Sequence, residues 1–112
     1  MSTFTYQPSK SSLRAETVVE FVNRSLLDFK MKEIPGMGPA TIAKFEDHGI
    51  YTPAQILAKF LSFVHAEDVT ALEVCNSFYE WANPIMGKAN THNLTFAMAN
   101  YAGEHGLFRY DM

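Results

Sequence analysis

The chain has too little cysteine to be held together by disulfide bonds. Its 112 residues contain one cysteine, Cys75, so no disulfide can form within the chain, which is typical of proteins from a reducing compartment. No apolar run approaches the roughly 20 residues that span a bilayer. Residues Met1 to Ser12 lack a basic start followed by an apolar stretch. We therefore expect neither membrane insertion nor a secretory signal.

Positive charge is also scarce. Nine lysines and arginines stand against twelve aspartates and glutamates, which gives a formal net charge of −3. The imbalance lies in the second half, because residues 1–56 carry six basic and six acidic residues, whereas residues 57–112 carry three and six. This balance excludes a broad basic groove for nucleic acid. It does not exclude a site that binds phosphate through backbone amides, since such a site needs no charged side chain.

Residues that could catalyse a reaction or bind a metal are few and scattered. The single cysteine allows no C-x-x-C pair, and no acidic pair or activated nucleophile is evident. No Walker loop or dinucleotide-binding fingerprint is present. We therefore expect no catalytic residue, no metal, no cofactor and no enzymatic activity. The four histidines lie in separate segments, at His48, His65, His92 and His105, which does not favour a metal site. We expect His92 to lie at the surface.

What the chain does have is helical periodicity. Apolar residues make up 47% of the sequence, enough for one domain with a hydrophobic core. They recur at helical spacing, and no stretch alternates as a half-buried strand does. The pattern predicts an all-α, compact bundle of about five helices over residues 12–112, after a flexible tail over residues 1–11. The helices are expected at about 12–29, 39–48, 53–64, 69–83 and 91–103.

Proline, glycine and small polar residues predict the ends of these helices. Pro39 and the pair Thr52-Pro53 are typical of helix starts, and Gly49 is typical of a helix end. Asn83-Pro84 is expected to end the fourth helix, with a loop over residues 84–90. Ser12 is expected to cap the first helix. Tyr6 lies in the polar tail, so we expect it to be the one aromatic residue outside the core.

The most informative stretch is residues 34–45, Ile-Pro-Gly-Met-Gly-Pro-Ala-Thr-Ile-Ala-Lys-Phe. An apolar residue leads into Pro-Gly-x-Gly, and a helical pattern follows at once. This is the signature of a helix-hairpin-helix, a small module that binds the nucleic-acid backbone. The free N–H groups of the helix start, together with the positive end of the helix dipole, form a site for a phosphate oxygen. The alternative is an ordinary glycine-containing turn between two helices.

With this architecture, the sequence resembles the barrier-to-autointegration factor family, small dimeric chromatin proteins of animals. The likeness extends from about Ala15 to Phe108. The family has Gly-Ile-Gly where this chain has Gly36-Met37-Gly38, and it shares Lys44, the glycine of Gly49-Ile50 and the pair Phe60-Leu61. A second block begins at Phe78-Tyr79-Glu80-Trp81, against Phe-Arg-Glu-Trp in the family, and continues through Met86-Gly87 to Leu107-Phe108.

The sequence departs from the family in four places. It has a longer tail before the first helix and an insertion between Leu61 and Phe78. Thr17 stands where the family has a phosphate-binding lysine, and Ala89-Asn90-Thr91 replaces the Asn-Ala-Lys that faces DNA in the family. Two basic contacts are therefore missing, and we expect weaker DNA binding than in the family.

The resemblance implies sequence-independent binding of double-stranded DNA through three regions on one face. The first region is the start of the first helix at Thr17, and the second is the hairpin with the helix after it. The third is the start of the last helix, as a degenerate copy of the hairpin. The residues of the second and third regions are Gly36, Met37, Gly38, Ala40, Thr41 and Lys44, and Lys88, Asn90 and Thr91.

The resemblance also implies a homodimer that bridges two DNA duplexes, with Leu57, Ala58 and Leu61 at the two-fold interface. The sequence favours a dimer independently, because the helix that carries Ile56 and Phe60 has more apolar surface than five short helices are expected to cover.

Localisation and partners follow from the same resemblance. It implies the nucleus, with the cytoplasm as the alternative, and partners at chromatin or the nuclear envelope. Two other interpretations stay open. One is a protein-interaction adaptor that has kept the fold but lost DNA binding, as the acidic second half allows. The other is an accessory hairpin domain of a repair or recombination system.

Overall fold

Five α-helices surround one core in the computed structural model, which describes residues 6–109 and, of Lys88 and Ala89, the backbone alone. Residues 6–109 contain no strand, so the predicted all-α architecture is confirmed. The helices are α1 (Ala15–Val22), α2 (Pro39–Asp47), α3 (Pro53–Leu61), α4 (Ala71–Met86) and α5 (Lys88–Glu104). Short 3-10 turns lie at Pro8–Lys10, Leu26–Asp28 and Met31–Glu33.

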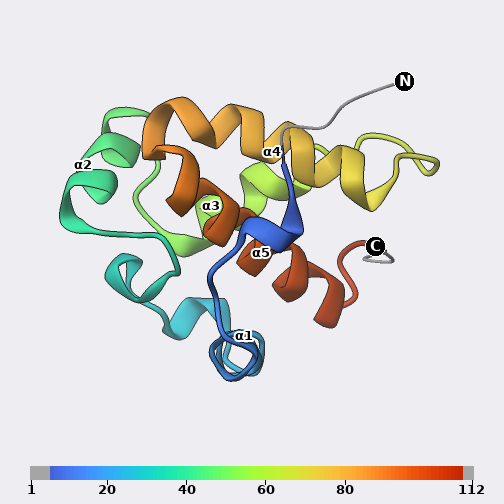
Figure 1. Cartoon of the computed structure of the whole chain (residues 1–112), viewed down its shortest axis with the longest axis horizontal. Coiled ribbons are helices and arrows are strands. Elements are labelled where there is room, and N and C mark those ends of the chain that lie inside the picture. The colour runs from blue at the N-terminus through green and yellow to red at the C-terminus, as the bar shows by residue number, and fades with distance from the viewer. Residues whose placement is uncertain (1–5, 110–112) are drawn as a thin grey trace.

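Helices α4 and α5, with 16 and 17 residues, form the centre of the fold. Only Gly87 separates them, with a φ of 91° that an L side chain rarely adopts. Helix α1 packs against α5, helix α2 packs against α4, and α3 packs against both central helices. In Figure 1, α4 crosses the top of the molecule and α5 runs below it toward the lower right, while α1 lies at the bottom.

Aromatic side chains join the outer helices to the central pair. The ring of Phe60 on α3 lies 5.4 Å from Phe78 on α4 and 5.2 Å from Phe108, and Phe60 and Phe78 are fully buried. Phe45 on α2, also fully buried, lies 5.8 Å from the ring of Trp81 on α4. Such ring pairs stabilise a core by about 0.5–1.5 kcal/mol each beyond their burial. The hairpin is therefore positioned by the α2–α4 packing that follows it.

The predicted break at Asn83-Pro84 is wrong. Helix α4 continues through Pro84 to Met86, and the predicted loop over 84–90 does not form. A proline inside a helix costs about 3 kcal/mol. Continuation buries Ile85 and Met86, and each such side chain contributes about 1.5–3 kcal/mol. Because α4 runs on, the last helix begins at Lys88 rather than at Asn90 or Thr91.

The first helix is shorter than predicted. It begins after Arg14, not at Ser12, and it ends at Val22. A separate 3-10 turn follows, in which the Ser25 hydroxyl accepts the N–H of Leu27 at 3.3 Å. The Leu26 N–H donates to the Tyr101 hydroxyl of α5 at 2.8 Å. This long-range hydrogen bond fixes a non-helical backbone where the local apolar period alone favoured a helix.

Of the tail predicted over residues 1–11, the structure describes the part from Tyr6 onward, which packs on the central helices; residues 1–5 lie outside the described part. Tyr6 is 1% exposed and belongs to the core, so its predicted exclusion is wrong. Its N–H donates to Asn76 Oδ1 at 3.0 Å. The tail is polar in composition, but its one buried aromatic residue, Tyr6, anchors it on the core.

The helix boundaries predicted at Pro39, Gly49 and Thr52 are confirmed, whereas α3 ends at Leu61 and α4 begins at Ala71, inside the predicted ranges 53–64 and 69–83. Pro39 is the first residue of α2, and Gly49 follows its end with a φ of 78°. Thr52 caps α3, and its Oγ1 accepts the Gln55 N–H at 3.3 Å. None of the helices in the described residues combines the length and the apolar character needed to cross a bilayer.

We predict that the Cys75 thiol is unreactive in the folded protein. Cys75 is fully buried, and burial raises its pKa to about 12, so the thiol is protonated at pH 8 and hidden from solvent. Ellman's reagent should label the native protein negligibly and the guanidinium-unfolded protein stoichiometrically. Rapid labelling of the native protein would contradict this burial.

Candidate nucleic-acid interface

The hairpin is a tight turn whose apolar side chains point into the core. The Met37 N–H donates to the Ile34 carbonyl at 3.1 Å and closes the turn. Ile34 is 2% exposed and Met37 8% exposed, so both side chains anchor the hairpin in the core. The backbone of Gly36 and Gly38 is left nearer the surface.

Helix α2 begins with amide donors that have no partner within the helix. Gly38 is its N-cap and supplies no side-chain cap, and Pro39 occupies the first position. The Ile42 N–H makes the first intrahelical bond, to the Gly38 carbonyl at 2.9 Å. The N–H groups of Ala40 and Thr41 precede that bond, so the helix provides them with no carbonyl partner. They point outward at the positive end of the helix dipole.

The two glycines of the hairpin have different roles. Gly36 has a φ of 88°, and a Cβ there would lie 2.8 Å from the Asn90 carbonyl oxygen and 3.1 Å from Met86 Cε. Gly38 has an extended backbone with φ −105° and ψ 172°, and a Cβ there would meet no atom within 4 Å. The backbone at Gly38 is therefore one that any residue can adopt. Gly36 is required by packing, whereas Gly38 leaves open space before the start of α2.

The contact between Gly36 and Asn90 brings two helix starts together. Asn90 lies in the first turn of α5, whose N-cap is Gly87 without a side-chain cap. The first intrahelical bond of α5 is donated by Thr91 to the Gly87 carbonyl at 3.1 Å. The hairpin that leads into α2 therefore lies against the first turn of α5, and each helix start presents amide donors.

Side-chain capping divides the helices of residues 6–109 into two groups. Helices α3 and α4 begin with capping boxes, in which Thr52 and Thr70 accept backbone N–H groups. Helices α1, α2 and α5 begin without any side-chain cap. These three uncapped starts are the same three regions in which the sequence predicted DNA contacts.

The structure separates the predicted contact residues into exposed and buried ones. Thr17, Ala40, Lys44 and Asn90 are exposed, while the Lys88 side chain lies outside the described residues. Of the N–H groups predicted to be offered at the start of α5, that of Thr91 is used within the helix, because it donates to the Gly87 carbonyl at 3.1 Å. Thr91 is fully buried and donates its hydroxyl to the Gly87 carbonyl at 2.7 Å.

Met37 and Thr41 are also buried side chains, at 8% and 9% exposure. This burial is compatible with the predicted contacts, which use backbone N–H groups. The Met37 N–H already donates to the Ile34 carbonyl, so of these two residues Thr41 alone provides an N–H at the helix start. A residue in the first turn can direct its side chain to the core while its N–H points outward along the helix axis.

His92 was expected at the surface and is 2% exposed. Its ring lies between Tyr79 at 4.5 Å and Tyr6 at 5.9 Å. This burial could not be predicted from local signals, because the tail that supplies Tyr6 is distant in the chain and polar in composition.

Thr17 lies on a groove beside the hairpin. The groove has a volume of about 490 Å³, and Thr17 and Pro35 both line it, together with Glu33. Glu33 accepts the Lys30 N–H at 2.8 Å and lies 3.6 Å from Arg24. The Lys30 hydrogen bond, followed by the charge of Arg24, lowers the pKa of Glu33. The acid beside the hairpin is therefore engaged within the chain.

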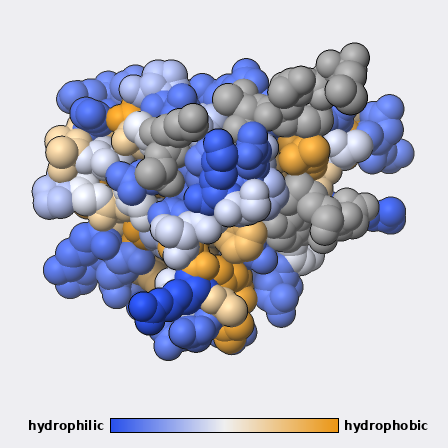
Figure 2. All heavy atoms as spheres, viewed as in Figure 1, coloured by the Kyte–Doolittle hydropathy of each residue, from blue (hydrophilic) through white to orange (hydrophobic). Residues whose placement is uncertain are grey.

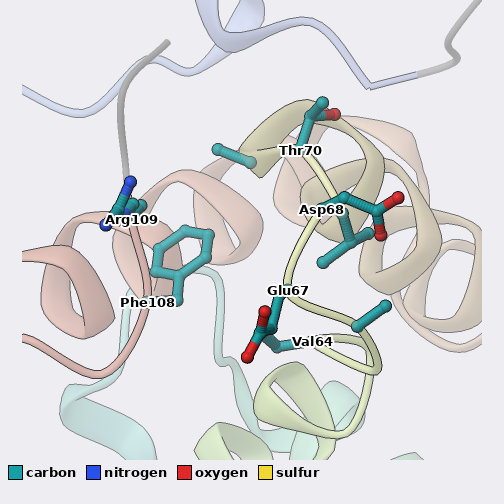
Figure 3. Close-up of a pocket in the computed structure, with 9 residues that line it drawn as sticks. Val64, Glu67, Asp68, Thr70, Phe108 and Arg109 are labelled. Atoms are coloured by element: carbon teal, nitrogen blue, oxygen red, sulfur yellow. The ribbon is translucent and has the colours of Figure 1, made fainter.

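A second hollow lies between residues 64–71 and the pair Phe108-Arg109, with a volume of about 760 Å³ (Figure 3). The carboxylate of Glu67 points toward the side of Phe108, whereas that of Asp68 points away. None of the predicted site residues lines this hollow. Over residues 6–109, no three histidines, cysteines or acids gather as ligands for a metal ion.

The predicted dimer surface is smaller than the sequence suggested. Ile56 and Phe60 are fully buried within the chain, so they leave no exposed apolar surface for a second copy to cover, contrary to the prediction. Leu57 and Leu61 are half-buried, and Ala58 is exposed on the same helix. These three residues are therefore accessible for the contact with a second copy that the sequence predicts.

The chain was compared with models of protein families, with curated proteins and with solved structures, and no match was found in any of the three. A function for this interface must therefore be argued from the three helix starts and from the motif order of the sequence.

We predict that the two hairpin glycines differ sharply in their tolerance of alanine. Gly36→Ala should lower the free energy of unfolding by about 2 kcal/mol or more, because of its positive φ and the contact with Asn90. Gly38→Ala should change it by less than about 0.5 kcal/mol. Urea denaturation of both variants measures this; equal stabilities would contradict the packing described for Gly36.

Proposed function

We propose that this chain binds double-stranded DNA independently of sequence and, as a homodimer, bridges two duplexes. The observation that carries the proposal is the set of three helix starts, α1, α2 and α5, that lack side-chain caps while α3 and α4 have them. Two of the three starts are neighbours through Gly36 and Asn90. A row of phosphates is the ligand that such a set of amide donors suits best.

Backbone amides make this proposal compatible with the acidic composition. Contacts from N–H groups to phosphate fix a protein on the duplex but do not read bases, so binding is independent of sequence. The salt dependence of binding scales with the number of phosphates that basic side chains neutralise. With Lys44 and Lys88 as the basic residues of the proposed site, the dependence should be modest.

The open space before Gly38 supports phosphate as the ligand of α2. Nothing within 4 Å of a Cβ at this position obstructs the approach to the Ala40 and Thr41 amides. The nearest predicted cation, Lys44, is exposed on the same helix one turn later. The Lys44 ammonium group would contact the next phosphate along the strand while the Ala40 and Thr41 amides bind the first phosphate.

A homodimer would convert two weak sites into one stronger binder. Two sites on one rigid body gain effective concentration on long DNA and hold two duplexes together. The α3 residues Leu57, Ala58 and Leu61 are the proposed interface. By the resemblance alone, the proposal extends to the nucleus, with the cytoplasm as the alternative, and to partners at chromatin or the nuclear envelope.

A protein-interaction adaptor is the second candidate. It is favoured by two apolar side chains at the surface, Val19 at 54% exposure and Leu27 at 85%. Figure 2 shows apolar atoms over α1 at the lower edge of an otherwise mainly hydrophilic face. Together with the acidic second half of the chain, this surface would suit a protein partner better than DNA.

We predict that Gly38→Glu abolishes duplex binding without unfolding the protein. The side chain enters open space, so the fold is kept, and its carboxylate repels the phosphate bound by α2. Fluorescence anisotropy with random duplex DNA should show a loss of more than about tenfold, or 1.4 kcal/mol.

Gly38→Gln is the matched control, since it adds nearly the same volume without charge, and it should lose much less affinity. Circular dichroism checks the fold of both variants. If Gly38→Glu binds random duplex as well as the wild type, the hairpin is a structural turn, and the adaptor becomes the better interpretation.

We predict a dimer of twice 12.6 kDa that Ala58→Glu converts to monomers, because two carboxylates would meet near the two-fold axis. Light scattering at tens of micromolar measures the mass. Ala66→Glu adds the same charge at an exposed position away from α3 and should remain dimeric. A monomeric wild type would refute the dimer, and a dimeric Ala58→Glu would place the interface elsewhere.

A further inference from the structure

Residues 6–14 form a strap across the two central helices. The strap begins at the buried Tyr6, continues through the 3-10 turn Pro8–Lys10 and ends at Arg14, the N-cap of α1. Figure 1 shows it descending in front of α4 and α5 to reach α1 at the bottom. It therefore connects directly to one of the three uncapped helix starts.

The first attachment of the strap is aromatic. The Tyr6 ring lies 6.2 Å from Tyr79 on α4 and 5.9 Å from His92 on α5. The Tyr6 N–H donates to Asn76 Oδ1 at 3.0 Å, and the Gln7 N–H donates to His92 Nδ1 at 3.5 Å. These contacts hold the upper part of the strap on both central helices.

The second attachment is a single side chain, Asn93 of α5. Its Oδ1 accepts the Ser12 N–H at 2.8 Å and the Ser11 hydroxyl at 3.2 Å. Its Nδ2 lies 3.0 Å from the Ser12 hydroxyl oxygen, which accepts its hydrogen bond. One amide group thus binds backbone and side chains of the strap immediately before α1.

The position of Asn93 gives these hydrogen bonds a consequence for the proposed DNA face. Asn93 lies in the turn of α5 that follows Asn90, and Asn90 contacts the hairpin at Gly36. Ser12 lies two residues before the N-cap of α1. Asn93 therefore connects the segment before α1 to the part of α5 that contacts the hairpin before α2.

We propose that Asn93 is a positioning residue: through the strap, it holds the start of α1 in register with the starts of α2 and α5, so that all three can contact one duplex. This rests on the proposed DNA-binding function. A contact held in place before binding avoids the entropy of ordering it on binding. Without Asn93, α1 remains folded on α5, but its first turn is free to move.

The decisive variant is Asn93→Ala, measured in the full-length protein. Asn100→Ala is the matched control, because Asn100 lies on the same helix and is half-buried, and its Nδ2 donates to the Phe96 carbonyl at 2.8 Å. Amide hydrogen exchange by NMR reports the strap, and anisotropy with random duplex DNA reports the site.

We expect Asn93→Ala to speed exchange of the Ser12 amide by about tenfold or more and to weaken DNA binding by roughly three- to tenfold. Asn100→Ala should change neither. Asn93→Asp keeps the acceptor for the Ser12 N–H, so slow exchange should be restored, which loss of packing alone would not predict.

A double-mutant cycle tests whether the strap acts as one unit. Tyr6→Ala removes the aromatic attachment. The double variant should lose less DNA-binding free energy than the sum of the losses in Tyr6→Ala and Asn93→Ala. Independent additive effects would show that the two attachments do not act on α1 together, and would overturn the proposal.

The remaining outcomes separate this proposal from the function on which it rests. Unchanged Ser12 exchange in Asn93→Ala overturns the role of Asn93 in holding the strap. Faster exchange with unchanged DNA affinity overturns its role in positioning the DNA face. A wild type that does not bind duplex DNA refutes the proposed function and with it the role of Asn93 in DNA binding, while the exchange data still decide whether Asn93 holds the start of α1.

Discussion

The close approach of the hairpin to the corner between α4 and α5 is the contact on which the arrangement of the candidate site depends. It requires that Gly36 have no side chain, because a Cβ would meet the Asn90 carbonyl oxygen at 2.8 Å. It also requires the sharp turn at Gly87, which brings the start of α5 back beside the end of α4. Two glycines far apart in sequence thus place two helix starts on one side of the molecule. Side chains with chemical function contribute little to this geometry.

Because the candidate site is built from backbone groups, an acidic chain is compatible with binding a polyanion. Helix starts provide partial positive charge from the backbone, which is independent of composition and pH. The protein does not cap three of its helices with side chains, although it caps α3 and α4 with threonine. An uncapped start forgoes about 1 kcal/mol of helix stability. The three starts without side-chain caps are the feature on which the proposed DNA binding rests.

Much of the fold could be predicted from the sequence because its signals are local. Pro39, Gly49 and Thr52 act within one helical turn, and each lies where the prediction placed it. The errors have long-range causes. Burial of Ile85 and Met86 outweighs the break at Pro84, and the bond from Leu26 to Tyr101 overrides a helical period. For the site, the three regions predicted from the sequence coincide with the helix starts that lack side-chain caps, but the burial of Met37, Thr41 and Thr91 could not be predicted from local signals.

The strap has a consequence for the order in which the chain folds. Helices α4 and α5 are joined by one residue, so their mutual contacts close short loops and can form early. The hydrogen bond between Ser12 and Asn93 spans 81 residues of sequence, and that between Gln7 and His92 spans 85. Contacts this distant form late, after the segments between them are compact. On a ribosome, the strap would therefore dock only after α5, which is synthesised later, has left the exit tunnel.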